Sequence, residues 1–252
     1  MTSILSGLPF QAQSGDRLVS KVVGAAIAAL FKQSETLNAT VRADPVAKLL
    51  QGSIDGFELL ASGLLMYNGL RLENLELYSQ AVAIDFSEIF QGRVKLRQPT
   101  QATMRVVLTE QDLATSFNTP FVLGKLKLLQ INGQPLSLRQ VGVAISNDGS
   151  LHIQAEAQMD PAGEWIGIDF STQVEVEDRH RIQFVQTTYQ GDPASVALSQ
   201  SLVEHVNSLL DLDKFALDGT RLRVDRIRIR DHKIVFYGSA QIDRFPTRKA
   251  VH

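Results

Sequence analysis

The side chains that could perform chemistry are thinly spread along the chain. Its five histidines never fall at the paired spacing of metal ligands, and the absence of cysteine excludes disulfides and thiolate metal sites. The sequence contains no G-x-S-x-G elbow, P-loop, glycine-rich dinucleotide turn or H-E-x-x-H motif. We therefore expect a protein that is not an enzyme, with no catalytic residue, no metal and no cofactor.

Carboxylates occur mainly beside apolar residues. Glu73, Glu76 and Asp85 alternate with leucine and isoleucine, as the solvated face of a strand would. Paired acids for glycoside hydrolysis are defined by their separation in space, and nothing in the sequence singles out one pair.

One segment of thirteen residues is strongly basic. It contains Arg221, Arg223, Arg226, Arg228, Arg230 and Lys233, opposed only by Asp225 and Asp231. One interpretation is a charged outer surface that blocks strand pairing at a sheet edge. The other is a docking patch for anionic phospholipid headgroups. No aromatic residues are interleaved for base stacking, so we expect no nucleic-acid partner.

The strands that must position these charges show a repeated pattern of apolar residues. Residues 70–77 and 222–229 share the spacing of apolar residues L-x-L-x-x-L-x-L, with an acid at the fourth position of each copy, Glu73 and Asp225. Side chains alternate along a strand, so the apolar residues share a face only if one extra residue is absorbed as a bulge. Apolar runs follow at 82–86 and 234–237. We predict two long, bent hairpins, each apolar on one face and charged on the other.

Helices are predicted before the strand-rich region and at two points within it. Helical spacing, a capping box and an Asp-Pro start predict helices over 16–32, 45–50, 110–117 and 193–210. The first is apolar nearly all round in its second half, which predicts deep burial. Tight-turn dipeptides such as Asn68-Gly69 and Asp148-Gly149 separate strands. These strands are predicted at 36–42, 57–65, 70–78, 81–86, 103–109, 125–131, 137–146, 151–158, 165–176 and 181–188. Strand follows strand with little helix between, which favours an antiparallel meander.

Length and composition are those of a soluble globular protein. The 252 residues are 44% hydrophobic and 21% charged, with a net charge of -2. No linker is visible, so we expect a single domain over 1–252. No signal peptide is recognisable, and the apolar run 22–31 is far shorter than the roughly twenty residues that span a bilayer. We expect a cytoplasmic protein that can be peripheral to a membrane.

The order of motifs resembles the LmeA-like phospholipid-binding family over about residues 45–242. The residues that carry the resemblance are 69–72, 75–77, 83–86, 108–113, 148–151 and 217–222, the last leading into the closing hairpin. The resemblance implies an α+β fold with a long, curved antiparallel sheet wrapped around helices, similar to tubular lipid-binding (TULIP/BPI-like) proteins. It also implies an apolar groove for acyl chains. Exported members carry a leader or a membrane anchor, and the sequence shows neither.

These observations predict a protein that binds a phospholipid, carries it between membranes and makes transient contact with an anionic membrane surface. The predicted groove residues are Val22, Val23, Ile27, Leu30, Leu70, Leu72, Leu75, Leu77, Ile84, Phe86, Leu222, Val224, Ile227, Ile229 and Phe236. The predicted headgroup patch is the basic segment above. The alternatives are a scaffold with a protein-filled core, whose protein partner the sequence does not name, and an esterase, which the missing nucleophile motif disfavours.

Overall fold

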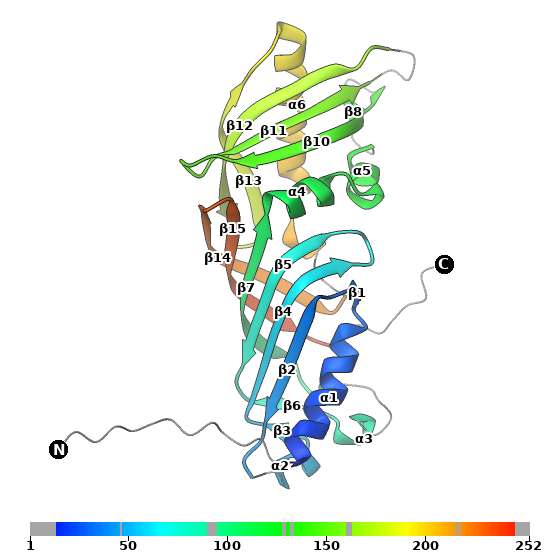
Figure 1. The fold of residues 1–252 in the computed structure, drawn as a ribbon, viewed down its shortest axis with the longest axis vertical. Coiled ribbons are helices and arrows are strands. Elements are labelled where there is room, and N and C mark those ends of the chain that lie inside the picture. The colour runs from blue at the N-terminus through cyan, green and yellow to red at the C-terminus, as the bar shows by residue number, and fades with distance from the viewer. Residues whose placement is uncertain are drawn as a thin grey trace, which may run out of the picture.

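The computed structural model describes residues 14–45, 47–89, 95–127, 130–131, 134–159, 163–214, 216 and 218–244. These residues form a mixed α+β structure whose sheets are antiparallel. Figure 1 shows an elongated molecule with a large sheet at one end and a smaller sheet at the other. The antiparallel α+β class predicted from the sequence is confirmed, but the strands form two main sheets rather than one.

The large sheet joins the beginning of the chain to its end. It contains β1 (Phe31–Gln33), β2 (Thr36–Arg42), β4 (Gly56–Met66), β5 (Arg71–Ser79), β7 (Thr100–Thr109), β14 (Thr220–Arg230) and β15 (Lys233–Ile242). The strand order is β1-β4-β5-β7-β15-β14, and β2 pairs with β4. The C-terminal hairpin β14–β15 therefore completes a sheet that the N-terminal strands begin.

The smaller sheet is a meander in the order β10-β11-β12-β13. Its strands are β10 (Ser137–Ile145), β11 (Leu151–Gln158), β12 (Ile166–Glu177) and β13 (Arg181–Tyr189). Two short pairs join β3 (Ser53–Ile54) to β6 (Val82–Ala83) and β8 (Gln130–Ile131) to β9 (Gln134–Pro135).

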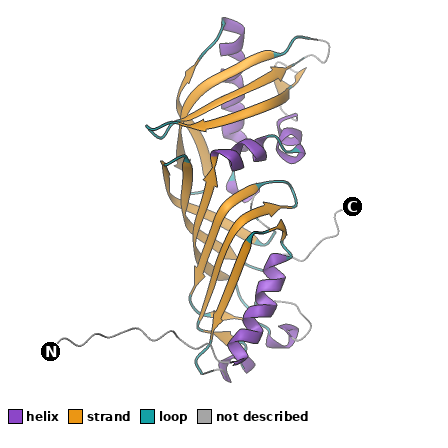
Figure 2. Ribbon diagram, in the orientation of Figure 1, coloured by secondary structure: helices purple, strands orange, loops and turns teal. Residues whose placement is uncertain are grey.

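Helices cover one side of the sheets, as the colouring in Figure 2 makes clear. They are α1 (Ser14–Ala28), α2 (Ala47–Leu50), α3 (Phe86–Ile89), α4 (Glu110–Phe117), α5 (Pro120–Lys127) and α6 (Pro193–Leu209), with a short 3₁₀ turn, η1 (Leu212–Lys214). The helix α1 packs on β2, α4 and α5 pack on β10, and α6 packs on β12 and β13.

Two helices begin where their capping residues predict. The Thr109 hydroxyl accepts a hydrogen bond from Asp112 N at 3.1 Å, and the Asp112 carboxylate accepts one from Thr109 N at 3.0 Å. At the start of α6, the Asp192 carboxylate accepts hydrogen bonds from the backbone of Ala194 and Ser195. Each side chain satisfies backbone donors that the first helical turn leaves free.

The first helix is shorter and less buried than predicted. It ends at Ala28 instead of residue 32, because Phe31 starts β1 and pairs with Met66 of β4. Val19, Val23 and Ile27 are buried at four-residue spacing, whereas Lys21 and Ala25 are exposed. The alanines make the helix apolar on nearly every side, but their small side chains do not need to be buried, so only one face of the helix lies in the core.

The first predicted hairpin does not form, because the segment 82–86 does not pair with the strand before it. Only Val82–Ala83 forms a strand, and it pairs with β3, while helix α3 begins at Phe86. The strand β5 pairs instead with β4 and β7. The strand predicted at 125–131 is also mostly wrong, since α5 continues to Lys127. Short apolar runs fit a strand or a helix equally well, and tertiary contacts decide between them.

The predicted bulge occurs in one copy of the repeated pattern. The register of β14 against β15 shifts between Val224 and Arg226, which makes Asp225 the extra residue. The register of β5 against β4 does not shift, although Gly63, opposite Glu73, adopts a left-handed φ of 57°. Because Leu72, Leu75 and Leu77 still pack against one core, this local irregularity lets β5 keep its leucines on one face.

Candidate functional site

The two copies of the repeated pattern share the inner face of the large sheet. Ile227 lies opposite Phe236, Phe236 opposite Val106, and Val106 opposite Leu75, which traces one apolar row across β14, β15, β7 and β5. These four side chains are half-buried. Residues about 150 positions apart in the sequence are thus brought to one surface by the strands between them.

This inner face connects the cores at the two ends of the molecule. One core lies between α1 and the large sheet, and another lies beneath the four-stranded sheet and α6. A small middle cluster of Met104, Val224 and Ala240 lies between them. Leu77 packs against both the α1 core and the middle cluster, and Ile227 and Phe236 pack against both the middle cluster and the α6 core. The apolar contacts are therefore continuous from one end core to the other.

Each end core contains a small cavity. The cavity beneath α1 measures about 30 Å³ and lies among Val19 and Val23 of the helix and sheet residues that include Val41, Phe57 and Ala102. The cavity near α6, lined by residues such as Phe170, Leu202 and Val206, is of the same size. Such a volume holds one or two water molecules, so neither cavity admits an acyl chain unless its walls separate.

Most of the predicted groove residues lie in this connected apolar region. Val23, Ile27 and Ile84 are buried in the α1 core, and Val224 is buried in the middle cluster. The half-buried members are Val22, Leu30, Leu72, Leu75, Leu77, Leu222, Ile227, Ile229 and Phe236.

Two further predicted groove residues are not assigned to that region. Leu70 precedes β5 in the turn after β4, and the Phe86 side chain lies outside the described residues. Sequence reasoning missed Val19, Val41 and Phe57 as lining of the α1 cavity. The signal for Val19 was its position four residues before Val23.

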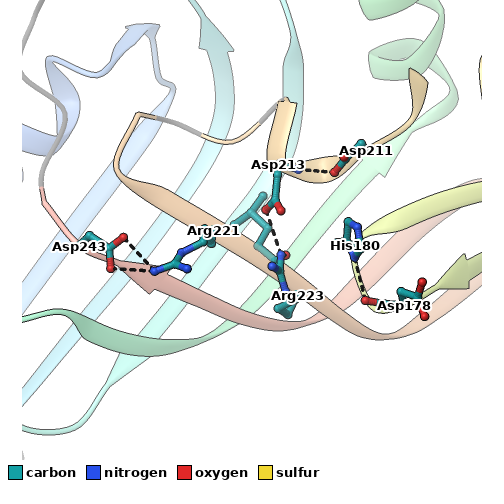
Figure 3. Close-up of polar contacts among 8 residues, drawn as sticks. Asp178, His180, Asp211, Asp213, Arg221, Arg223 and Asp243 are labelled. Atoms are coloured by element: carbon teal, nitrogen blue, oxygen red, sulfur yellow. Dashed lines mark hydrogen bonds and ion pairs between the residues drawn. The ribbon is translucent and has the colours of Figure 1, made fainter. Parts of the chain in front are cut away.

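The arginines of the basic segment lie on the opposite face of β14 from its groove residues, Lys233 begins β15, and several of these cations are paired. Figure 3 shows Arg221 bound to Asp243 and Arg223 bound to Asp213, at 3.1 Å and 2.9 Å. Arg230 pairs with Asp231 at 3.1 Å. The predicted patch therefore carries less unpaired positive charge than the count of its basic residues indicates.

Arg226 and Arg228 have a different environment. Their guanidinium carbons lie 4.6 Å and 5.9 Å from the ring centre of Tyr237, on the neighbouring strand. Within the described part of the chain, no carboxylate lies within ion-pair distance of Arg226, Arg228 or Lys233. Tyr237 was missed in the sequence because the hairpin, and not local spacing, places it beside Arg226.

The bulge of β14 joins the two sheets. Val224 N donates a hydrogen bond to Arg179 O at 2.6 Å, and the Arg179 side chain pairs with Asp225 at 2.6 Å. Arg179 belongs to the turn between β12 and β13. From the same region, Val176 and Leu212 pack against the middle cluster. The backbone hydrogen bond and the apolar contacts thus join the smaller sheet to the larger one, with the exposed Arg179–Asp225 ion pair beside them.

Titratable side chains form isolated contacts. His152 Nε2 lies 2.7 Å from Asp169 Oδ1 on the smaller sheet. Burial alone would raise the pKa of Asp169, but hydrogen bonds with Gln154 and His152 lower it below its usual value. Among the described residues, no three histidines or carboxylates gather as a metal site.

The described geometry is that of an antiparallel α+β protein with a continuous apolar face, a helix over each end and basic side chains along one strand. Among the described helices, none is long and apolar enough to cross a membrane. The chain matches the model of the LmeA-like phospholipid-binding family over residues 12–239 and belongs to this family. The match confirms the resemblance seen in the sequence and extends it to include α1. No curated protein and no solved structure matched the chain.

Proposed function

We propose that this protein binds a phospholipid without covalent chemistry, holds its acyl chains against the inner face of the large sheet beside α1, and carries it between membranes. The observation that carries the proposal is the continuous apolar inner face of the large sheet, whose half-buried leucines on β5 pack against the α1 core. Burial of an acyl chain contributes about 0.8 kcal/mol per methylene, so part of one chain gives useful affinity. Carriage also requires transient contact with a membrane surface.

Uptake of a chain requires α1 to move away from the sheet, because the cavity has room for only one or two water molecules. The position of the helix supports such a movement. It packs on β1 and β2, at the margin of the large sheet, with Val19, Val23 and Ile27 as its buried residues. The Ser20 hydroxyl ties it to the sheet by accepting a hydrogen bond from Val41 N at 2.9 Å.

The chain offers a direct test of this movement. A Cβ built on Gly24 of α1 would lie 3.6 Å from the Cβ of Ala39 in β2, a separation suited to a disulfide. Because the chain has no cysteine, the double variant Gly24→Cys/Ala39→Cys forms this bond without competition. We expect the oxidised variant to take up a fluorescent phospholipid from vesicles more slowly than the same protein after reduction. Equal uptake in the two redox forms would exclude a moving α1.

Native mass spectrometry with lipid extraction tests the binding itself. A stoichiometric phospholipid adduct is expected on the purified protein or after incubation with vesicles. The alternative function is a scaffold that recruits a protein partner, and the small size of both cavities favours it. A bare mass under both conditions would favour the scaffold.

We also propose a single domain with a tubular lipid-binding architecture. The hairpin β14–β15 supports this, because it belongs to the large sheet while Ile229 and Phe236 pack against the core of the smaller one. One cooperative unfolding transition, seen by both tryptophan fluorescence and circular dichroism, is expected; separate transitions would indicate two domains.

A further inference from the structure

We infer that Arg226 and Arg228, held against the ring of Tyr237, dock the protein on the headgroups of an anionic phospholipid membrane. The inference rests on the proposed function, since docking serves the exchange of a carried lipid. It replaces a diffuse patch of six cations with a defined pair on the outer face of β14.

The first support is the uneven neutralisation of the basic segment. Arg221, Arg223 and Arg230 each donate to an aspartate within 3.1 Å. The guanidinium groups of Arg226 and Arg228 face no carboxylate partner in the described residues, and both side chains are exposed. Their N–H donors are therefore available to phosphate oxygens, which guanidinium groups bind in a bidentate manner.

The second support is the environment of Tyr237. This residue is half-buried and lies opposite Arg105 of β7, and the interaction with Tyr237 raises the pKa of Arg105. Arg105 also pairs with Glu76, so this third guanidinium is already neutralised. Tyr237 lies on β15, which pairs with β7 on one side and β14 on the other, and its ring holds Arg226 and Arg228 by cation–π contact. Side chains that are positioned before binding lose less conformational entropy when they bind. Tyrosine is also a residue that membrane–water interfaces favour.

The third support is the position of β14. It is the last strand of the large sheet, and the alternation beyond the bulge places Arg226 and Arg228 on the face opposite Ile227 and Ile229. A headgroup bound to the arginines is therefore separated by the sheet from a chain held on the inner face. This geometry assigns the arginines to the membrane surface and not to the carried lipid.

Two double variants with the same loss of charge test the inference. Arg226→Gln/Arg228→Gln removes the two arginines that have no carboxylate partner in the described residues and leaves Lys233, and Arg221→Gln/Arg230→Gln removes paired cations from the same strand and face. Binding is measured by co-sedimentation with phosphatidylcholine–phosphatidylglycerol vesicles and with phosphatidylcholine vesicles. At about a factor of five per basic residue, the first variant should bind anionic vesicles about 25-fold more weakly than the parent. The second should lose clearly less, because the guanidinium donors of Arg221 and Arg230 already bind Asp243 and Asp231 and must leave them to reach a phosphate.

The outcomes separate this inference from the proposed function. Equal losses in both variants would show a diffuse field and overturn it, as would parental binding that is absent or insensitive to salt. Arg226→Lys/Arg228→Lys keeps the charge and should recover part of the binding; full recovery would overturn the role of the planar guanidinium. Thermal unfolding verifies that each variant is folded. The lipid adduct in native mass spectrometry should persist in every variant. Its absence from the parent as well would count against the proposed lipid site, whereas its loss in Arg226→Gln/Arg228→Gln alone would show that these arginines hold the carried lipid and would overturn the inference.

Discussion

Gly238 of β15 lies directly against the backbone of Arg223: a Cβ at position 238 would come 1.9 Å from the Arg223 carbonyl oxygen. The bulge at Asp225 produces this close approach, because it folds the backbone of β14 toward its partner strand. Only glycine leaves room for the bulge, and the bulge in turn places the arginines of β14 on the outer face.

Replacement of Gly238 should therefore destabilise the fold. We expect Gly238→Ala to lower the free energy of unfolding by about 2 kcal/mol, since either the bulge or the β14–β15 ladder must shift. Urea denaturation measures the loss. Gly167→Ala is the matched control in another strand, because a Cβ there meets nothing within 4 Å. A similar loss in both variants would mean that strand glycine as such, and not the bulge, is responsible.

Leu64 and Leu75, on neighbouring strands, should respond differently to truncation. Leu64 is 0% exposed, so Leu64→Ala should cost about 2–5 kcal/mol through the cavity that it leaves. Leu75 is only half-buried, and Leu75→Ala should cost about 1 kcal/mol. Under the proposed function, Leu75→Ala also reduces the retained phospholipid. A Leu75→Ala protein with the parental lipid content would remove this residue from the binding face.

Glu110 should make stability depend on pH. Hydrogen bonds from Ile145 N and from His232 lower the pKa of the Glu110 carboxyl below its usual 4.5. The carboxylate therefore stabilises the fold above about pH 4.5, and this contribution is lost as the pH falls through the lowered folded value. Glu110→Gln should unfold about 1 kcal/mol more easily at neutral pH and match the parent in strong acid.

The comparison requires thermal melts of the parent and of Glu110→Gln across the acid range. Glu204→Gln, which changes an exposed acid on α6, is the control and should melt like the parent. A difference between Glu110→Gln and the parent that persists unchanged in acid would contradict the assignment.

Ser199 is a site at which the fold can be improved. Its hydroxyl is 0% exposed and has no hydrogen-bond partner among the described residues. Ser199→Ala should raise stability by about 1 kcal/mol, because it removes an unsatisfied polar group and favours the helix. Ser201→Ala gains only helix propensity and loses the bond to Ala197 O, so a larger gain at position 201 would contradict this account.

Local sequence signals predicted α1, α2, α4 and α6 and many of the strands, but not α3 or α5. The capping box at Thr109 and the Asp192-Pro193 start fix α4 and α6 because the side chains act on backbone groups only two or three residues away. The alternation at 36–42 and 151–158 predicts β2 and β11 with their observed bounds. The runs at 82–86 and 125–131 failed because short apolar segments carry no period that distinguishes strand from helix.

The sequence predicts on which face of a strand each residue of the candidate site lies, but not which residues it contacts. Alternation places the leucines of β5 and the arginines of β14 on definite faces. It does not reveal that Arg221 meets Asp243, that Arg226 meets Tyr237, or that β5 pairs with β7. Those contacts join residues far apart in the chain, and only the completed sheet defines them.

The placement of β15 beside β7 has a consequence for synthesis. The register runs from Thr100 opposite Ile242 to Thr109 opposite Lys233. The ribosome therefore completes β7 long before it makes β15, the strand that pairs with it. While the ribosome adds the intervening residues, the growing chain exposes an unpaired β7 edge, which is a template for association with other chains. The nascent protein therefore needs protection of that edge until its last strands emerge, and contacts this distant in sequence also make the final step of folding slow.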